Sequence, residues 1–116
     1  MAKYRMVELK IPWDRSSYAA TWSKTTAKSV ARKLRPLIGK KVVLYGGGGW
    51  DKAICRLKNI RMYKSPPYQR GGKMRKNEYY VDADLKILEI ENDWLGGRKE
   101  FSPHLGSWKI AKLVKE

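Results

Sequence analysis

Residues 57–76 concentrate basic, aromatic and turn-forming side chains and contain no aspartate or glutamate. So many ammonium and guanidinium groups are too costly to desolvate without partners, and the segment must therefore stand in water or against an anionic partner. Aromatic rings interleaved with Lys and Arg can stack on unpaired nucleobases while the cations hold the phosphate backbone. The candidate residues are Lys58, Arg61, Tyr63, Lys64, Tyr68, Arg70, Lys73, Arg75 and Lys76, with Arg56 just before the segment and Trp50 after a run of glycines.

A second basic surface is predicted on a helix. From about Ser17 the apolar residues recur at helical spacing, and the helix should end near Leu34 because Pro36 disfavours helical geometry at the residue before it. Four cations on the opposite side follow at steps of four, four and three, which places them in one stripe. A solvated helix face would also explain the stripe, but the charge of the whole chain favours a surface that faces phosphates. The helix stripe consists of Lys24, Lys28, Arg32 and Arg35.

The sequence offers little for catalysis. Asp82 and Asp84 alternate along a predicted strand, and with Lys86 they could hold Mg²⁺ as a nuclease does. The solvated outer face of an antiparallel strand, balancing a basic neighbour, explains this spacing better. Cys55 is expected to face inward and His104 to lie in a loop, so no nucleophile is expected beside a base. We predict a protein with no catalytic residues, no metal site and no cofactor.

The overall charge favours an anionic partner. Lys and Arg number 26 against 11 Asp and Glu, which gives a formal net charge of +15 at pH 7. The first 76 residues hold 20 of the 26 basic and 3 of the 11 acidic residues. Such a field attracts polyanions, and nucleic acid is the commonest polyanion inside a cell. Because duplex binding does not need exposed aromatic rings, RNA or single-stranded DNA is favoured over duplex DNA.

Length and cysteine content indicate one intracellular domain. A chain of 116 residues can bury about two thirds of its unfolded surface as a single domain, residues 1–116. One cysteine excludes an internal disulfide and fits reducing conditions. No apolar run approaches the roughly 20 residues of a membrane span, and the N-terminus lacks a signal-peptide core. We therefore expect a cytoplasmic protein with no membrane partner.

One helix and about five strands are expected to position the candidate residues. Alternating patterns predict strands over residues 4–11, 41–45, 53–63 and 78–91, and a closing strand near residues 108–114. The alternation changes phase near Asn59, which predicts a β-bulge, after which Arg61 and Tyr63 share a face. Residues 46–49, all glycine, should connect two strands, because no Lys-Ser or Lys-Thr pair follows them as in a phosphate-binding loop. Residues 64–76 should form a long loop, because their prolines and glycines disfavour sheet pairing.

These elements predict an α+β fold. It would be a small, strongly curved antiparallel sheet or a partly open β-barrel, with one amphipathic helix between the first and second strands. The leading hypothesis is a non-enzymatic protein that clamps a nucleic-acid backbone between the helix stripe and the basic segment, alone or within a ribonucleoprotein such as the ribosome. The alternative is an accessory or inhibitor protein that binds an acidic protein surface. A Mg²⁺-dependent nuclease is the third hypothesis.

Overall fold

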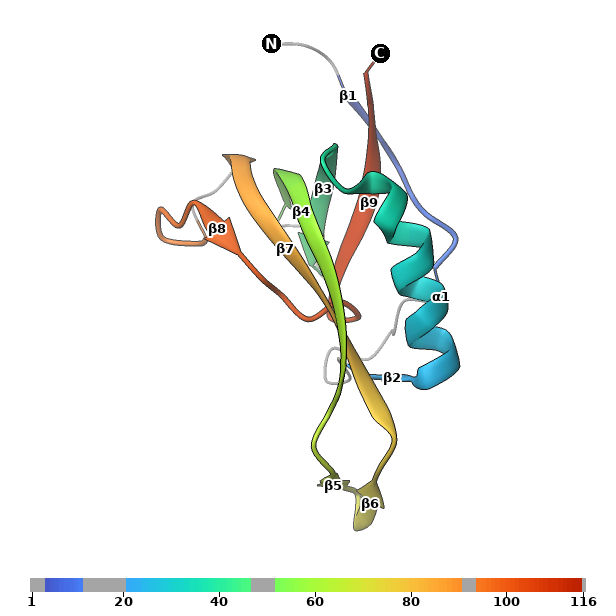
Figure 1. The fold of residues 1–116 in the computed structure, drawn as a ribbon. Helices are drawn as coiled ribbons and strands as arrows, with labels where there is room; N and C mark the ends of the chain where they lie inside the picture. The colour runs from blue at the N-terminus through green and yellow to red at the C-terminus, as the bar shows by residue number, and fades with distance from the viewer. Residues whose placement is uncertain (1–3, 12–20, 47–51, 91–93, 116) are drawn as a thin grey trace.

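A computed structural model describes residues 4–11, 21–46, 52–90 and 94–115 of the chain (Figure 1). Most of its regular structure is antiparallel sheet, with one α-helix, α1 (Lys24–Leu34), and a short 3-10 helix, η1 (Arg35–Leu37). The strands are β1 (Tyr4–Val7), β2 (Trp22–Ser23), β3 (Lys41–Gly46), β4 (Lys52–Lys64), β5 (Tyr68–Arg70), β6 (Lys73–Arg75), β7 (Glu78–Ile90), β8 (Glu100–Phe101) and β9 (Trp108–Lys115).

The main sheet is open. Its strands follow the order β1-β9-β3-β4-β7-β2, and β8 pairs with β7 further along the same strand. All pairings between these strands are antiparallel. The α+β class and the antiparallel sheet are therefore confirmed, while the partly open barrel is not. The five predicted strands correspond to β1, β3, β4, β7 and β9, and the shorter strands were not foreseen.

Helix α1 covers one face of the sheet at β4 and β7, and the core lies between them (Figure 1). Its buried residues are Ala27, Val30, Ala31 and Leu34, as the helical spacing predicts. The predicted start near Ser17 was wrong, because Ser23 caps the helix and its hydroxyl accepts a hydrogen bond from the Thr26 amide at 3.3 Å. The predicted end at Leu34 is confirmed. Within the described ranges, no helix is long and apolar enough to cross a membrane.

Trp22 shows why the helix begins later than its pattern indicated. It lies in β2, opposite Tyr79 of β7, and its indole Nε1 donates a hydrogen bond to the Leu105 carbonyl at 3.0 Å. The ring is buried against the same core as the helix. Trp22 therefore contributes to the core although it lies in a strand and not in the helix. Its packing in the tertiary structure determined its backbone conformation, and the helical spacing of the apolar residues did not.

Strands β4 and β7 form the longest pairing and contain two irregularities. One lies between Leu57 and Asn59, so the predicted bulge near Asn59 is confirmed. After it, Ile60 and Met62 pack toward the core while the two residues that alternate with them, Arg61 and Tyr63, project from the opposite face. The prediction that Arg61 and Tyr63 share a face is also confirmed.

The inner part of β4 is as apolar as its alternation predicts. Cys55 is fully buried beside Leu57, and burial raises the pKa of its thiol to about 12. At ordinary pH this side chain is a small hydrophobe and not a nucleophile. Strand β3 pairs antiparallel with β4, which agrees with a connection through the glycine run, although residues 47–51 lie outside the described part of the chain.

Beyond the helix, β4 and β7 continue into a projection that carries β5 and β6 at its tip (Figure 1). We call residues 64–77 the basic arm. The prediction of an unpaired loop was wrong here, since β5 and β6 pair with each other, Gln69 opposite Met74. Gly71 and Gly72 make the turn with φ values of 60° and 78°, a left-handed geometry that glycine adopts without strain. The glycines thus close a hairpin instead of preventing one.

Candidate nucleic-acid interface

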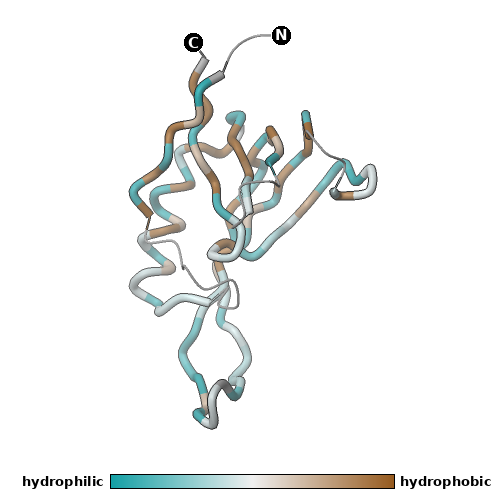
Figure 2. Tube along the Cα trace, turned by 180° about the vertical axis from the view of Figure 1, so that it is seen from behind, coloured by the Kyte–Doolittle hydropathy of each residue, from teal (hydrophilic) through white to brown (hydrophobic). Residues whose placement is uncertain are grey.

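The basic arm presents its cations to solvent. Lys64, Lys73, Arg75 and Lys76 are all exposed, and no described side chain accepts a hydrogen bond or forms an ion pair with them. The side chain of Arg70 lies outside the described part of the structure. In Figure 2 the arm is mostly teal and white, whereas the brown, hydrophobic segments lie mainly in the body of the sheet and in the helix. The arm therefore has charge without a core of its own.

The helix stripe is equally open. Lys24, Lys28, Arg32 and Arg35 are exposed because they lie opposite the face of α1 that packs on the sheet. Over the described ranges, their ammonium and guanidinium groups make no hydrogen bond or ion pair. Lys33, next to the stripe, differs because its ammonium group donates to the Lys10 carbonyl at 2.6 Å.

The stripe and Arg61 lie on opposite sides of the sheet. Helix α1 packs on the face of β4 that carries Ile60, and Arg61 projects from the other face. The stripe points further away still, because it lies on the outer side of the helix. The hypothesis of a single clamp between the stripe and Arg61 was therefore wrong. Lys24 nevertheless begins α1 directly after β2, which pairs with the arm end of β7, so one end of the stripe lies at the base of the arm (Figure 1).

The candidate cations on β4 have partners within the protein. Arg56 Nη1 donates to the Gly39 carbonyl at 2.7 Å, and Lys58 Nζ lies 3.1 Å from Glu100 Oε1. Arg61 makes two parallel hydrogen bonds to Asp84, Nε to Oδ2 and Nη2 to Oδ1, each of 3.0 Å. Such a bidentate pair uses two of the five N–H donors of the guanidinium and balances its charge, which weakens its attraction for a phosphate.

Asp84 is held by this pair and by a hydroxyl. Ser102 Oγ donates to Asp84 Oδ1 at 2.8 Å. Partial burial alone would raise the pKa of Asp84, but the hydrogen bonds from Arg61 and Ser102 outweigh it, and the net pKa is lowered. The same contact with Asp84 raises the pKa of Arg61. Asp84 thus balances a basic neighbour on the adjacent strand, as expected, but its side chain is only 28% exposed. It is less solvated than expected because the segment that contains Ser102 runs along the edge of β7 and places the Ser102 hydroxyl beside it.

Asp82 is buried, which its strand pattern did not predict. Only 3% of the residue is exposed, and its carboxylate accepts a hydrogen bond from the Tyr63 hydroxyl at 2.8 Å. His104 Nδ1 lies 2.6 Å from the other carboxylate oxygen. His104 was expected in a loop, and it forms an isolated β-bridge with Asp82, so the chain near residue 104 runs along the edge of β7.

Three rings gather around Asp82, and we call Tyr63, Tyr80 and His104 the ring cluster. The imidazole of His104 stacks on Tyr80 with centroids 4.2 Å apart and planes at 19°. Tyr63 lies beside Tyr80 at 5.3 Å with planes at 41°. Burial, followed by the hydrogen bond to Asp82, raises the pKa of the Tyr63 phenol to about 12. This hydroxyl therefore stays a neutral donor to Asp82 at ordinary pH.

Sequence reasoning proposed Tyr63 but missed Tyr80 and His104. The signal for Tyr80 was present, because it shares a strand face with Asp82 and lies opposite Tyr63 across the predicted pairing. His104 carried no such signal, because it comes from a segment distant in the chain. Tyr68 is tied to the body of the protein by a hydrogen bond of 3.0 Å between its hydroxyl and Thr21 Oγ1. Trp50 lies outside the described residues.

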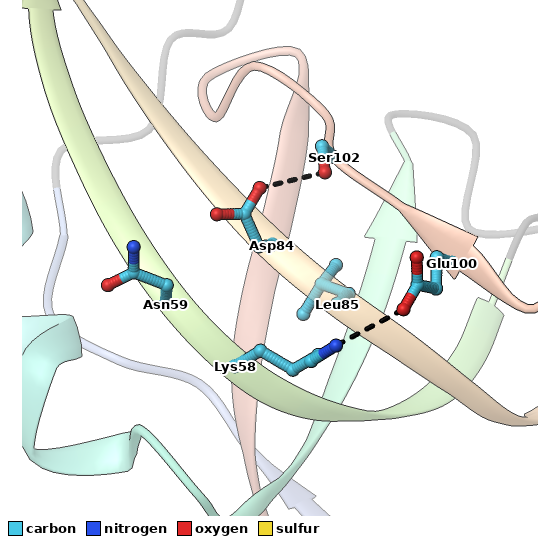
Figure 3. Close-up of a pocket in the computed structure, with 6 residues that line it drawn as sticks. All are labelled: Lys58, Asn59, Asp84, Leu85, Glu100 and Ser102. Atoms are coloured by element: carbon cyan, nitrogen blue, oxygen red, sulfur yellow. Dashed lines mark hydrogen bonds and ion pairs between the residues drawn. The ribbon is translucent and has the colours of Figure 1, made fainter.

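A shallow depression lies over β7, between the bulge of β4 on one side and β8 on the other (Figure 3). Its volume is about 380 Å³, and within it Lys58 pairs with Glu100 and Ser102 with Asp84. The depression thus has little unbalanced charge for a ligand. The lining residues are Lys58, Asn59, Asp84, Leu85, Glu100 and Ser102.

The polar groups do not form a familiar catalytic set. Ser102 donates to Asp84, and no hydrogen bond joins it to His104 in the described structure, so a Ser-His-Asp chain is not assembled. The described residues contain no group of three or more His, Cys, Asp or Glu side chains that could hold a metal ion. Comparisons with protein-family models, with curated proteins and with solved structures found no match for this chain. Its function must therefore be inferred from its own residues.

Proposed function

We propose that this protein is a non-enzymatic nucleic-acid-binding protein that contacts the backbone of RNA or single-stranded DNA through the basic arm and the helix stripe. The observation that carries the proposal is the difference between paired and unpaired cations. Arg56, Lys58 and Arg61 have partners in the protein, so we assign them to the fold. The exposed cations of the arm and the stripe have none among the described residues, so they are the ones available to phosphates.

The unpaired cations also have an energetic reason to bind a polyanion. Within the stripe they follow at steps of three and four residues, within the arm they lie in one short segment, and on a chain of net charge +15 like charges so placed repel one another. A phosphate backbone relieves this repulsion, and each neutralised phosphate releases condensed counterions, which makes the binding favourable at low salt. One end of the stripe lies at the base of the arm, so one nucleic-acid strand that passes there could contact both surfaces.

A single strand is favoured over a duplex because exposed rings accompany the cations. Tyr63 is 39% exposed at the end of β4, immediately before Lys64. Stacking on such rings requires unpaired bases. We propose action in the cytoplasm, by the protein alone or within a ribonucleoprotein. Asp82 and Asp84 already accept hydrogen bonds from protein groups, which does not favour the Mg²⁺-nuclease hypothesis.

The proposal is tested by the salt dependence of binding. Fluorescence anisotropy with a short labelled single strand, RNA or DNA, should give an association constant that falls steeply as salt rises from about 50 mM. A variant in which Lys64, Lys73, Arg75 and Lys76 are replaced by Ala should lose up to about 3 from the slope of log K against log salt, since each single-strand phosphate contact contributes about 0.7.

A charge-matched control separates a defined surface from a general effect of net charge. Replacing the exposed Lys86, Arg98, Lys99 and Lys112 by Ala removes the same four charges from other parts of the surface. This control should keep the slope of the wild type. Equal losses in both variants, or no binding at about 50 mM salt, would contradict the proposal and favour an acidic protein partner, which a pull-down after nuclease treatment would reveal. Breakdown of the labelled strand in the presence of Mg²⁺ would instead revive the nuclease hypothesis.

A further inference from the structure

The ring cluster is built as a platform that is open on one side. Tyr80 covers one face of the His104 imidazole in a nearly parallel stack, yet 45% of the His104 side chain remains exposed. Close to half of this side chain is therefore open to solvent on the sides that Tyr80 does not cover. Tyr63, beside Tyr80, is 39% exposed as well. A flat aromatic molecule could continue this stack without any rearrangement of the protein.

Hydrogen bonds to a buried carboxylate and along the main chain hold the rings of the platform in place. The buried carboxylate of Asp82 binds the Tyr63 hydroxyl at 2.8 Å and His104 Nδ1 at 2.6 Å, and it fixes both rings at once. Main-chain hydrogen bonds from Ala83 to Pro103 (3.3 Å) and from Leu105 to Val81 (2.8 Å) hold the His104 segment on β7. Rings that are already fixed lose little conformational entropy when a ligand stacks on them.

The location of the platform indicates what would stack there. Tyr63 and Tyr80 are register partners, and the next pair along the strands, Lys64 and Tyr79, begins the basic arm. A polyanion held by the arm would therefore bring its bases to the ring cluster. An unpaired nucleobase has the flat π face that such a stack accepts.

We propose that the ring cluster is a stacking site for one unpaired nucleobase, with His104 as the outermost ring of the stack. This inference rests on the proposed function and adds the part of the nucleic acid that is recognised at this face of the sheet. Contacts of the arm with phosphates do not distinguish a strand with bases from one without them, whereas the ring cluster does.

Because His104 is the only histidine of the chain, its imidazole proton signals report the site directly in the wild-type protein. We expect an upfield ring-current shift of these signals when a short oligothymidine is added. An abasic oligomer of the same length and charge should leave them nearly unchanged. Equal shifts with both oligomers would overturn the stacking site, and oligouridine in place of oligothymidine tells RNA from DNA.

Two replacements at His104 separate stacking from hydrogen bonding. His104→Gln keeps a group that can donate to Asp82 but has no ring, while His104→Phe keeps a ring but cannot donate. If the site stacks a base, the wild type should bind oligothymidine about 5- to 100-fold more tightly than the abasic oligomer. His104→Gln should reduce this ratio, and His104→Phe should retain it. The opposite order would show that only the hydrogen bond matters.

The inference and the proposed function fail in different ways. Salt-dependent binding with equal affinity for oligothymidine and the abasic oligomer would overturn the stacking site and leave the nucleic-acid-binding proposal standing. No salt-dependent binding of either oligomer would overturn both. Circular dichroism and thermal unfolding of the two variants confirm that each is folded before its ratio is read.

Discussion

The β4–β7 pairing and the basic arm beyond it both carry many cations, but these cations differ in whether they have partners within the protein. In the β4–β7 pairing, Arg61 lies opposite Asp82 in the register and is also bound to Asp84. In the basic arm, Lys73, Arg75 and Lys76 are exposed and have no partner among the described side chains. The paired cations of the β4–β7 region therefore contribute to the fold, while those of the arm are available to bind an anionic ligand.

This difference teaches that the net charge of a basic protein overstates its capacity to bind anions. A guanidinium in a bidentate pair with a carboxylate has its charge balanced within the protein, whatever its exposure. Arg61 is still 47% exposed at its side chain, so exposure alone would have placed it in the interface. Three measurements test this distinction between paired and unpaired cations.

The largest expected effect is at Asp82. Asp82→Ala removes the acceptor for both Tyr63 and His104 from a buried position, so we expect the free energy of unfolding to fall by about 2–4 kcal/mol. Urea denaturation measures the change. Glu100→Ala is the matched control, because Glu100 is an acidic partner of a cation but is 70% exposed, and its loss should cost less than about 1 kcal/mol. Similar costs for the two variants would show that Asp82 does not organise this face.

The second prediction compares an arginine that has a carboxylate partner, Arg61, with one that has none among the described residues, Arg75. Arg61→Ala should lower the free energy of unfolding by about 1–2 kcal/mol, because it leaves Asp84 without its bidentate partner, and should leave the salt slope unchanged. Arg75→Ala should leave stability within about 0.5 kcal/mol and reduce the slope for a single strand by about 0.7. Urea denaturation and anisotropy on the same two proteins give both quantities. A reduced slope for Arg61→Ala would place Arg61 in the interface after all.

The smallest effect concerns pH. The pKa of Asp84 is lowered in the folded protein, so its contribution to stability is complete above the unfolded pKa of about 4 and is lost as the pH falls through the folded pKa. The difference in unfolding free energy between the wild type and Asp84→Asn should therefore be largest near neutral pH and shrink in acid. Ser102→Ala should move this loss to higher pH, because it removes one of the hydrogen bonds that lower the pKa. A difference that is constant with pH would contradict this account.

Local patterns in the sequence determined the secondary structure where they were long and regular. The alternation along β4 and β7 predicted their pairing, the buried side of β4 and the bulge near Asn59, because a period of two and its interruption are properties of the strand itself. The apolar spacing likewise predicted the buried face of α1 and its end at Leu34. The charge distribution marked residues 57–76 as a segment that stays in water, which holds for residues 64 onward but not for Leu57 and Ile60, which are buried.

Only the tertiary structure decided which charges are free. Asp82 and Asp84 alternate like solvated carboxylates, and nothing near them in the chain indicates that residues 102–105 pair along the edge of β7 and place Ser102 and His104 beside them. Likewise, the helical spacing predicted which face of α1 carries the basic stripe. It did not predict that the sheet separates this stripe from Arg61. Local periodicity determines which residues share a face of one element, whereas the pairing of a charge depends on what packs against that face, and this contact joins segments distant in the sequence.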